Sequence, residues 1–365
     1  SLVPIKAKRK FFFVVFRVIS ALRRVIAIEY GNSDFNLMAV IVTGAAGFIG
    51  SAVALALLAR GEKVVGIDNI NDYYDQNLKK ARLERLLQCK TFEFHKVDIA
   101  EPTPVKTVFT KYPNITGIIH LAAQAGVRYS LVNPYAYTRA NIEGHLVLME
   151  AAKNLDKLTH FIYASSSSVY GANKSFPFST QDRTDSPVSL YAATKKSMEL
   201  LSESYARMWG IPLTGLRFFT VYGPWGRPDM AAFIFVRKML AGEPIQVFNN
   251  GDMKRDFTYI DDIVAGIVAC LEKPPNNASK QNECPHALYN IGNNRSEYLM
   301  HFIEVLEGAL GIKAEMDFQP MQPGDVKETY ADIGATRRDF GFDPKTTIEE
   351  GLPKFVAWYR EYYGI

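Results

Sequence analysis

The sequence YAATK places Tyr191 and Lys195 four residues apart, on a segment whose pattern predicts a helix. That spacing puts both side chains on one helix face. Tyrosine, with a free pKa of about 10, is a poor base at neutral pH, but a nearby ammonium favours the phenolate and lowers that pKa. The pair could then take a proton from a hydroxyl group. Because the same pattern often marks only a solvated helix face, its meaning depends on its surroundings.

A run of four serines closes a predicted buried strand upstream of this helix, in the sequence HFIYASSSSVYG. Ser166 precedes Tyr191 by 25 residues, and the run contains no carboxylate. The pattern fits either a polar turn or a set of hydroxyl groups that carry chemistry. Ser165 and Ser167 are expected at least to finish the strand.

Three glycines, Gly44, Gly47 and Gly50, lie between a predicted strand and a predicted helix in the sequence VTGAAGFIGS. A turn this tight needs residues without Cβ, so that backbone N–H groups can approach a pyrophosphate at the helix N-terminus. The strand–turn–helix context makes the triplet a strong signal for a dinucleotide site. Phe48 and Ile49, inside the turn, are expected to border that site.

Two aspartates end the next two predicted strands, and they bear on the choice of dinucleotide. Asp68 lies 18 residues after Gly50, where a carboxylate accepts hydrogen bonds from an adenosine ribose and repels a 2′-phosphate. NAD is therefore favoured over NADP. Asp98 could reach the adenine amine, and the neighbouring residues Asn69 and Ile99 are expected to line the same end of the site.

Short apolar runs alternate with helical patterns from Met38 to about residue 217. Runs that are buried on both faces and alternate with helices predict an α/β fold with a doubly wound parallel sheet of the Rossmann type. The expected strands are residues 38–44, 63–68, 91–98, 115–122, 160–165 and 212–218. The expected helices are residues 48–61, 75–88, 103–111, a long segment after Pro134, and 190–210.

The pattern becomes less regular after residue 218, which predicts a smaller C-terminal α/β lobe with a cleft between the two parts. We therefore expect a dinucleotide-binding domain at 38–217 that carries the catalytic residues. The substrate lobe at 218–365 is expected to interleave with it. Residues 1–37 form a basic extension with seven Lys or Arg residues against two acidic ones, which leaves the rest of the chain nearly neutral.

Several motifs together are similar to those of the extended short-chain dehydrogenases/reductases, in the nucleotide-sugar epimerase and dehydratase group. These motifs are TGAAGFIG, HLAAQAGV, SSSSVYG, YAATK, GPWGRPDM and KRDFTYIDD, and the resemblance runs from about Met38 to the C-terminus. Within the group the chain most resembles the UDP-glucuronate 4-epimerases, in the segments DNINDYYD, AQAGVRYS and LRFFTVYGPWGRPDM.

The resemblance implies roles for residues that spacing alone does not assign. It implies Tyr191, Lys195 and Ser166 as catalytic residues, and Leu121, Ala122, Ala123 and Asn141 as neighbours of the cofactor. It also implies a UDP-sugar site that contains Ser167, Ser168, Arg128, Thr220, Arg227, Val247, Phe248, Arg255 and Asp325. Arg255 would hold the diphosphate and Asp325 the uridine ribose. Gln322 stands where hexose epimerases often have an arginine.

The implied reaction is NAD-dependent epimerisation at C4 of UDP-glucuronate through a 4-keto sugar. Dehydratases of the group carry Asp-Glu before the VYG sequence and decarboxylases typically carry Glu there, whereas this chain has Ser167 and Ser168. Thr220 and Arg227, and Arg128 beside them, match positions near a sugar carboxylate. The alternatives are a UDP-hexose or N-acetylhexosamine 4-epimerase, a UDP-glucuronate decarboxylase, and a vestigial sugar-nucleotide-binding protein.

Composition limits which other partners and ligands are expected. The near-neutral charge of residues 38–365 does not indicate a nucleic-acid partner. The three scattered cysteines fit a reducing cytoplasm. They show no metal-ligand spacing, so no metal is expected. No transmembrane span is expected. Residues 6–28 could be an extension without a fixed fold, a basic helix on a membrane surface, or a targeting peptide. A homodimer is expected, through helices around residues 134–153 and 190–209.

Overall fold

The computed structural model describes residues 39–275, 284–322 and 325–365. The expectations for residues 1–37, including membrane-surface contact through residues 6–28, lie outside these ranges. Among the helices of the described ranges, none is long and apolar enough to cross a membrane.

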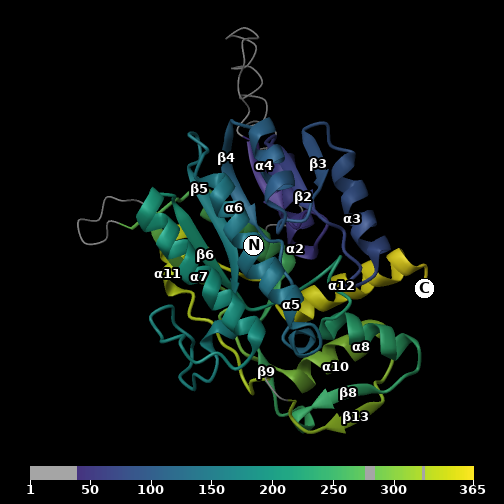
Figure 1. The fold of residues 1–365 in the computed structure, drawn as a ribbon. Helices are drawn as coiled ribbons and strands as arrows, with labels where there is room; N and C mark the ends of the chain where they lie inside the picture. Colours follow the sequence, from purple (N-terminus) through teal and green to yellow (C-terminus); the bar gives the residue numbers. More distant parts are fainter. Residues whose placement is uncertain (1–38, 276–283, 323–324) are drawn as a thin grey trace, which may run out of the picture. The chain divides into compact units, whose positions relative to one another are not determined.

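A seven-stranded parallel sheet forms the centre of the described chain, with the strand order β11-β6-β5-β4-β1-β2-β3 (Figure 1). The predicted α/β fold with a parallel sheet is confirmed. The order runs outward in both directions from β1 and β4, as in a doubly wound sheet. The strands are β1 (Ala39–Thr43), β2 (Lys63–Asp68), β3 (Phe92–Lys96), β4 (Ile115–His120), β5 (His160–Ser166), β6 (Leu213–Phe218) and β11 (His286–Ile291).

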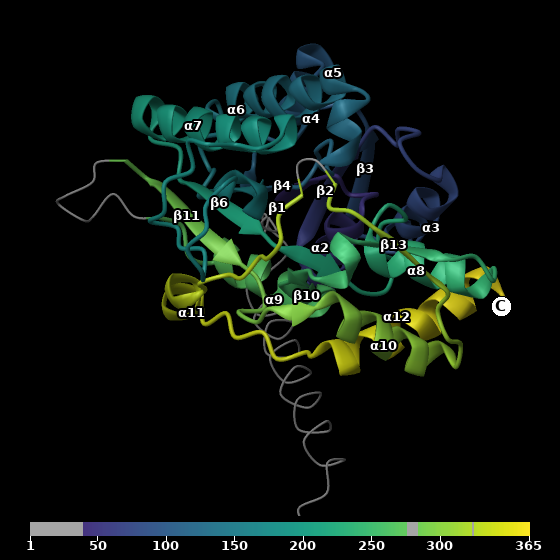
Figure 2. The same cartoon turned by 90° about the horizontal axis from the view of Figure 1, so that it is seen from below.

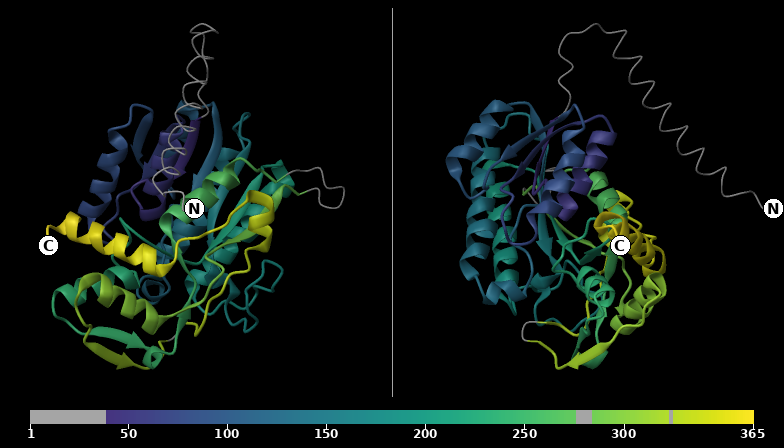
Figure 3. Two further views of the ribbon diagram at one scale, coloured as in Figure 1. Left: turned by 180° about the vertical axis from the view of Figure 1, so that it is seen from behind. Right: turned by 90° about the vertical axis from the view of Figure 1, so that its right-hand side faces the viewer.

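Helices cover both faces of this sheet, as Figure 2 and the right panel of Figure 3 show. One layer contains α4 (Pro102–Lys111), α6 (Gly144–Ala152) and α7 (Leu190–Trp209), and the other contains α2 (Phe48–Ala59) and α9 (Ile260–Leu271). Successive residues of β1 pack alternately against the two helix layers. Val40 and Val42 pack in the core with α2 and α9, whereas Ala39 and Ile41 pack in the core with α4, α6 and α7. This alternation explains why the strand is apolar throughout.

The segment after Pro134 differs from the single α-helix that we expect from the sequence. It divides into α5 (Pro134–Tyr137), a π-helical stretch η2 (Thr138–Glu143) and α6. π-helical turns often occur at functional sites. This one contains Asn141, whose amide makes the buried hydrogen bonds described below.

The chain beyond β6 builds three small two-stranded sheets and several helices beside the large sheet. β7 (Thr220–Tyr222) pairs with β10 (Phe257–Tyr259), β8 (Ile245–Phe248) with β13 (Met316–Gln319), and β9 (Lys254–Arg255) with β12 (Glu297–Tyr298). β11 joins the large sheet although it follows these elements in sequence. The division at residues 217/218 stays a prediction.

The remaining elements complete the two layers and the region around the small sheets. They are α3 (Gln76–Leu87), η1 (Arg128–Leu131), η3 (Ser167–Tyr170), α8 (Ala231–Leu240), η4 (Asn249–Gly251), α10 (Leu299–Leu310), α11 (Gly334–Phe340) and α12 (Ile348–Tyr363). Figure 3 shows α12 running along the side of the chain that faces away from α6 and α7.

Three fully buried histidines make the fold sensitive to acid. His120, His145 and His160 are 0% exposed, and burial lowers the pKa of each, to about 3 for His145 and about 4 for His160. The unfolded chain binds their protons near pH 6.5, so protons favour unfolding between about pH 6.5 and pH 4. We expect the free energy of unfolding to fall by about 2 kcal/mol per histidine from pH 7 to pH 5.

Urea unfolding at pH 7 and at pH 5 measures this change. The raised pKa values of two buried carboxyl groups, Asp68 and Asp256, act in the opposite direction and offset part of the loss. A midpoint that is equal at the two pH values, or higher at pH 5, would contradict the assignment of neutral buried imidazoles.

Candidate active site

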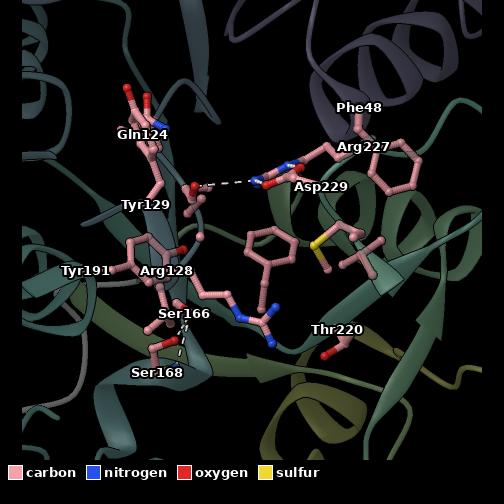
Figure 4. A pocket seen from close by; sticks show the side chains of 18 of the residues that line it. Phe48, Gln124, Arg128, Tyr129, Ser166, Ser168, Tyr191, Thr220, Arg227 and Asp229 are labelled. Carbon is pink, nitrogen blue, oxygen red and sulfur yellow. Dashed lines mark hydrogen bonds and ion pairs between the residues drawn. The ribbon is translucent and has the colours of Figure 1, made fainter. Parts of the chain in front are cut away.

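A cavity of about 1040 Å³ opens beyond the C-terminal ends of the sheet strands (Figure 4). Ligands bind at this edge in open α/β sheets. The predicted site residues that line it are Gly44, Gly47, Phe48, Ile49, Gly50, Asp68, Asn69, Asp98, Ile99, Leu121, Ala122, Ala123, Arg128, Ser166, Ser167, Ser168, Tyr191, Lys195, Thr220, Arg227, Phe248, Arg255 and Asp325. Asn141 and Val247 are not among the lining residues.

The glycine turn packs so closely that side chains would not fit. A Cβ on Gly44, where φ is +73°, would lie 2.8 Å from the backbone nitrogen of Ala122, and one on Gly50 would lie 2.0 Å from the Gly44 oxygen. Gly47 immediately precedes α2 and offers no capping side chain. The helix N-terminus therefore faces the cavity with free N–H groups, which suits a dinucleotide pyrophosphate.

Asp68 ends β2 and serves both the turn and the cavity. Its carboxylate accepts hydrogen bonds from the backbone nitrogens of Ala46 at 3.1 Å and Ile70 at 2.8 Å. Burial raises its pKa, and these bonds and the charge of Lys79 oppose that increase. Together with the close-packed glycines, a carboxylate at this position fits the adenosine end of NAD.

Tyr191 and Lys195 project from the first turns of α7, which begins after the capping residue Ser189. The Lys195 ammonium is 1% exposed and donates a hydrogen bond of 2.7 Å to the carbonyl of Ala164. Burial, and then the charge of Arg227, lower the pKa of Lys195 to about 7. The spacing of the two residues thus brings both to the cavity.

The environment of Tyr191 differs from the one that we expect from the sequence. Burial raises its pKa, while a hydrogen bond with Ser166 and the charge of Arg227 oppose the increase. Lys195 lies 6.0 Å from the centroid of the tyrosine ring. The pKa of Tyr191 is therefore raised in this structure, and the lowering predicted from Lys195 is not seen.

The serine run divides between the cavity and the interior. Ser166 accepts a hydrogen bond from the backbone nitrogen of Ser168 at 3.2 Å, and its hydroxyl donates to the Ser168 hydroxyl at 3.2 Å. Figure 4 shows these two side chains close to Tyr191. The hydroxyl of Ser165 instead donates to the buried carboxylate of Glu199 at 2.7 Å.

The three residues predicted near a sugar carboxylate do not form one cluster. Arg227 pairs with Asp229, through Nε at 2.9 Å and a second contact through Nη2, and in Figure 4 this pair lies near Phe48 and away from Thr220. Arg128 lies on the Thr220 side in the same view and projects its guanidinium into the cavity. It forms an ion pair of 3.3 Å with Asp325.

The predicted nucleotide end of the cavity contains Arg255, Phe248 and Asp325. Arg255 donates to the carbonyl oxygens of Lys254 at 2.8 Å and Lys327 at 3.1 Å, and burial lowers its pKa. The Arg128 guanidinium lies 4.6 Å from the centroid of the Phe248 ring.

Two predicted residues act from behind the cavity wall. Val247 is 0% exposed and its side chain belongs to the hydrophobic core, because alternate residues of β8 face opposite sides, so its contact with substrate stays a prediction. The side-chain oxygen of Asn141 accepts a hydrogen bond from the backbone nitrogen of Gln124 at 2.9 Å. Its side-chain nitrogen donates to the Gln124 backbone carbonyl at 3.0 Å and to the Thr194 hydroxyl at 3.0 Å. Asn141 thus holds the loop after β4 against α7.

Sequence reasoning missed polar residues both in the cavity wall and behind it. Tyr73 donates a hydrogen bond of 3.1 Å to Asp229 and so joins the pair with Arg227. Arg82 is fully buried behind the glycine turn, where it donates to the carbonyls of Ala46, Trp225 and Gly226. Tyr73 lies in the DNINDYYD segment, whose similarity to the epimerases is the available signal, whereas Arg82 lies on α3, outside the matched segments.

Comparisons with known proteins identify the family of the chain. Residues 40–292 match the NAD dependent epimerase/dehydratase family. UDP-glucuronate 4-epimerase 1 of Arabidopsis thaliana is 46% identical over 335 residues, which cover 90% of this chain and 78% of that protein.

Solved structures give the same family. A crystal structure of UDP-glucuronic acid 4-epimerase from Bacillus cereus, in complex with UDP-glucuronic acid and NAD, is 36% identical with a TM-score of 0.81, covering 89% of this chain and all of that one. UDP-glucose 4-epimerase from Thermotoga maritima is 31% identical with a TM-score of 0.78, at 89% and 100% coverage. The chain belongs to the NAD dependent epimerase/dehydratase family, as its motifs predict.

Proposed function

We propose that the chain catalyses the NAD-dependent 4-epimerisation of UDP-glucuronate to UDP-galacturonate. The observation that carries this proposal is the convergence of Ser166, Tyr191 and Lys195 on one cavity, beside a glycine turn that fits NAD, with no carboxylic acid in the serine run. The plant and Bacillus cereus relatives are named for this reaction.

Bound NAD accepts a hydride from C4 of the sugar and later returns it to the opposite face of the ring. Tyr191 takes the proton of the 4-hydroxyl as a general base and gives it back after the sugar turns over. Ser166 lies beside the same phenol, where its hydroxyl can turn to donate to the phenolate and orient the reacting oxygen. Lys195 is fixed through the Ala164 carbonyl, with its Nζ 6.0 Å from the centroid of the Tyr191 ring, and its protonated form would add positive charge to this part of the cavity.

The cavity favours epimerisation over elimination, because the acids in its wall are engaged elsewhere. Among the described residues, those that line it include four aspartates and no glutamate. Asp68 and Asp98 lie at the predicted cofactor end, Asp325 pairs with Arg128, and Asp229 is held by Arg227 and Tyr73. None of the four belongs to the serine run beside Tyr191, where a dehydratase would place its acid.

A uronic acid substrate imposes one further requirement on the site. The 4-keto sugar is a β-keto acid, which loses CO₂ when the bond to the carboxylate aligns with the ketone π system. We assign Thr220 and Arg128, which lie on the same side of the cavity, to hold the carboxylate out of that alignment; Arg227, predicted to share this role, lies on the other side. Arg128 is 55% exposed and can turn toward the sugar by giving up its single contact of 3.3 Å with Asp325, whereas Arg227 must loosen two contacts with Asp229.

The proposal also covers the partner, the location and the oligomeric state of the enzyme. Its partner is a UDP-sugar, and the free cysteines Cys89, Cys270 and Cys284 support a reducing cytoplasmic location. We propose a homodimer that buries the outer faces of α6 and α7, where Leu146 and Leu200 are 37% and 59% exposed. Sedimentation of the chain, compared with a Leu200→Glu variant, tests the dimer.

Product analysis with two substrates tests the reaction. Incubation with UDP-glucuronate should give UDP-galacturonate, whereas UDP-glucose should be converted much more slowly, because it has no carboxylate for the cations of the cavity. Faster conversion of UDP-glucose would favour a hexose epimerase, a UDP-pentose product would favour a decarboxylase, and no product from either would favour a vestigial binding protein.

A further inference from the structure

A buried ion pair lies directly behind the catalytic residues. Glu199 follows Lys195 by one turn of α7, and its carboxylate is 2% exposed. It accepts hydrogen bonds from Arg217 Nε at 2.8 Å, from Arg217 Nη2 at 3.0 Å and from the Ser165 hydroxyl at 2.7 Å. Arg217 lies on β6 opposite Ser165 in the strand register. One carboxylate therefore joins α7, β5 and β6.

Helix α7 forms hydrogen bonds with two consecutive residues at the end of β5. Lys195 donates to the carbonyl of Ala164, and Glu199 accepts from the hydroxyl of Ser165. The next residue of the strand is Ser166, which lines the cavity close to Tyr191 on the first turn of α7. The two contacts thus set the position of the Ser166 hydroxyl relative to the phenol.

Stability alone gives a poor reason for this arrangement. A buried ion pair stabilises a fold little better than apolar packing of similar volume. Burial alone raises the pKa of Glu199, but the hydrogen bond and charge of Arg217 and the hydrogen bond from Ser165 more than offset it, so the pKa is lowered and the carboxylate stays ionised. Lys196 adds an ion pair of 3.2 Å from the outer side of α7.

We infer that Ser165, Glu199 and Arg217 are positioning residues that hold the Ser166 hydroxyl against the phenol of Tyr191. The inference deepens the proposed function, since it rests on Tyr191 as the proton-transfer group. Ser165 is then the member of the serine run that faces inward to fix the strand, while Ser166 faces the reacting sugar. Loss of the inner contact lets Ser166 move away and removes one donor to the phenolate.

Ser165→Ala is the variant to measure, because it leaves the ion pair of Glu199 and Arg217 intact. Thr214→Val is its control: Thr214 lies on β6, is 0% exposed and bonds to His160 at 2.8 Å, so its loss removes a buried hydroxyl far from Tyr191. The pKa of Tyr191 can be followed by NMR of isotope-labelled tyrosine in the NAD-bound protein, with the signal assigned through Tyr191→Phe. The other groups facing Tyr191 are Lys195, Arg227, Asp229 and the ring of Tyr137, and both variants leave them in place.

We expect Ser165→Ala to raise the pKa of Tyr191 by about one, the size of a lost hydrogen bond to a charged group. We also expect it to lower kcat with UDP-glucuronate by about 10-fold with KM nearly unchanged, because the sugar-nucleotide contacts remain. Thr214→Val should leave the pKa of Tyr191 and kcat as in the unmodified chain. Ser165→Thr, which keeps the hydroxyl, should restore both.

Equal shifts of the Tyr191 pKa in Ser165→Ala and Thr214→Val would overturn the inference, as would an unchanged pKa in Ser165→Ala. The NMR titration needs no turnover, so it separates the two proposals. A chain that fails to convert UDP-glucuronate but shows the Tyr191 shift in Ser165→Ala alone would contradict the proposed substrate and leave the positioning role in place.

Discussion

Replacing Tyr191 with phenylalanine is expected to lower kcat with UDP-glucuronate by about 1000-fold or more, within the range for loss of a positioned general base. The phenol is half-buried and lies on the cavity wall beside Ser166, and the ammonium of Lys195, one helical turn away, is held by the Ala164 carbonyl. Because phenylalanine retains the ring, NAD binding and the melting temperature should change little. Steady-state kinetics and the absorbance of bound cofactor measure these effects.

Tyr205→Phe is the matched control for that change. Tyr205 lies on the same helix, is 7% exposed and donates a hydrogen bond of 2.5 Å to Glu150 at a distance from the cavity. Its loss should lower stability without lowering kcat. Residual turnover in Tyr191→Phe within about 10-fold of the unmodified enzyme would assign the proton transfer to another group.

Replacing Gly50 with alanine is expected to abolish NAD binding and to destabilise the fold by about 3 kcal/mol, as overpacking of backbone against backbone does. The new Cβ would lie 2.0 Å from the Gly44 oxygen and 2.7 Å from its carbonyl carbon. Neither atom can move without opening the turn that receives the pyrophosphate. Thermal unfolding and the cofactor content of the purified protein report the two effects.

Gly308→Ala provides the same chemical change at a harmless position. Gly308 lies in α10, and a Cβ there meets no neighbouring atom within 4 Å. Alanine should stabilise that helix by about 0.5 to 1 kcal/mol and leave NAD bound. If Gly50→Ala retained NAD and melted with the unmodified protein, the close packing of the glycine turn would be disproved.

The parts of the site that sequence predicts well depend on backbone geometry. The Tyr191–Lys195 spacing, the glycine triplet and the strand-end position of Asp68 each follow from the pitch of a helix or the end of a strand, and the cavity contains all of them. The alternation of apolar runs with helices likewise predicts the parallel sheet, because strands covered on both faces must be apolar throughout.

The parts that sequence does not predict depend on side chains that meet across the fold. Asp229 pairs with Arg227 two residues away, but Tyr73 reaches the pair from 156 positions earlier in the chain, and no spacing rule reveals that contact. In contrast, the opposite orientations of neighbouring serines in the run follow from the alternation of strand side chains, once Ser166 is placed at the cavity.

The π-helical stretch at Thr138–Glu143 is a third case. Its sequence shows no signal for the wider turn, and within it Asn141 makes contacts with Gln124 and Thr194, which are far away in sequence. Tertiary contacts therefore decide this local geometry, and helix propensity does not record them.

The most direct test of the central claim is the fate of deuterium placed at C4 of UDP-glucuronate. Epimerisation within one closed site predicts UDP-galacturonate that retains the full label at C4, formed in ordinary water without added cofactor. Loss of the label to solvent, or label recovered only in a UDP-pentose, would contradict the account.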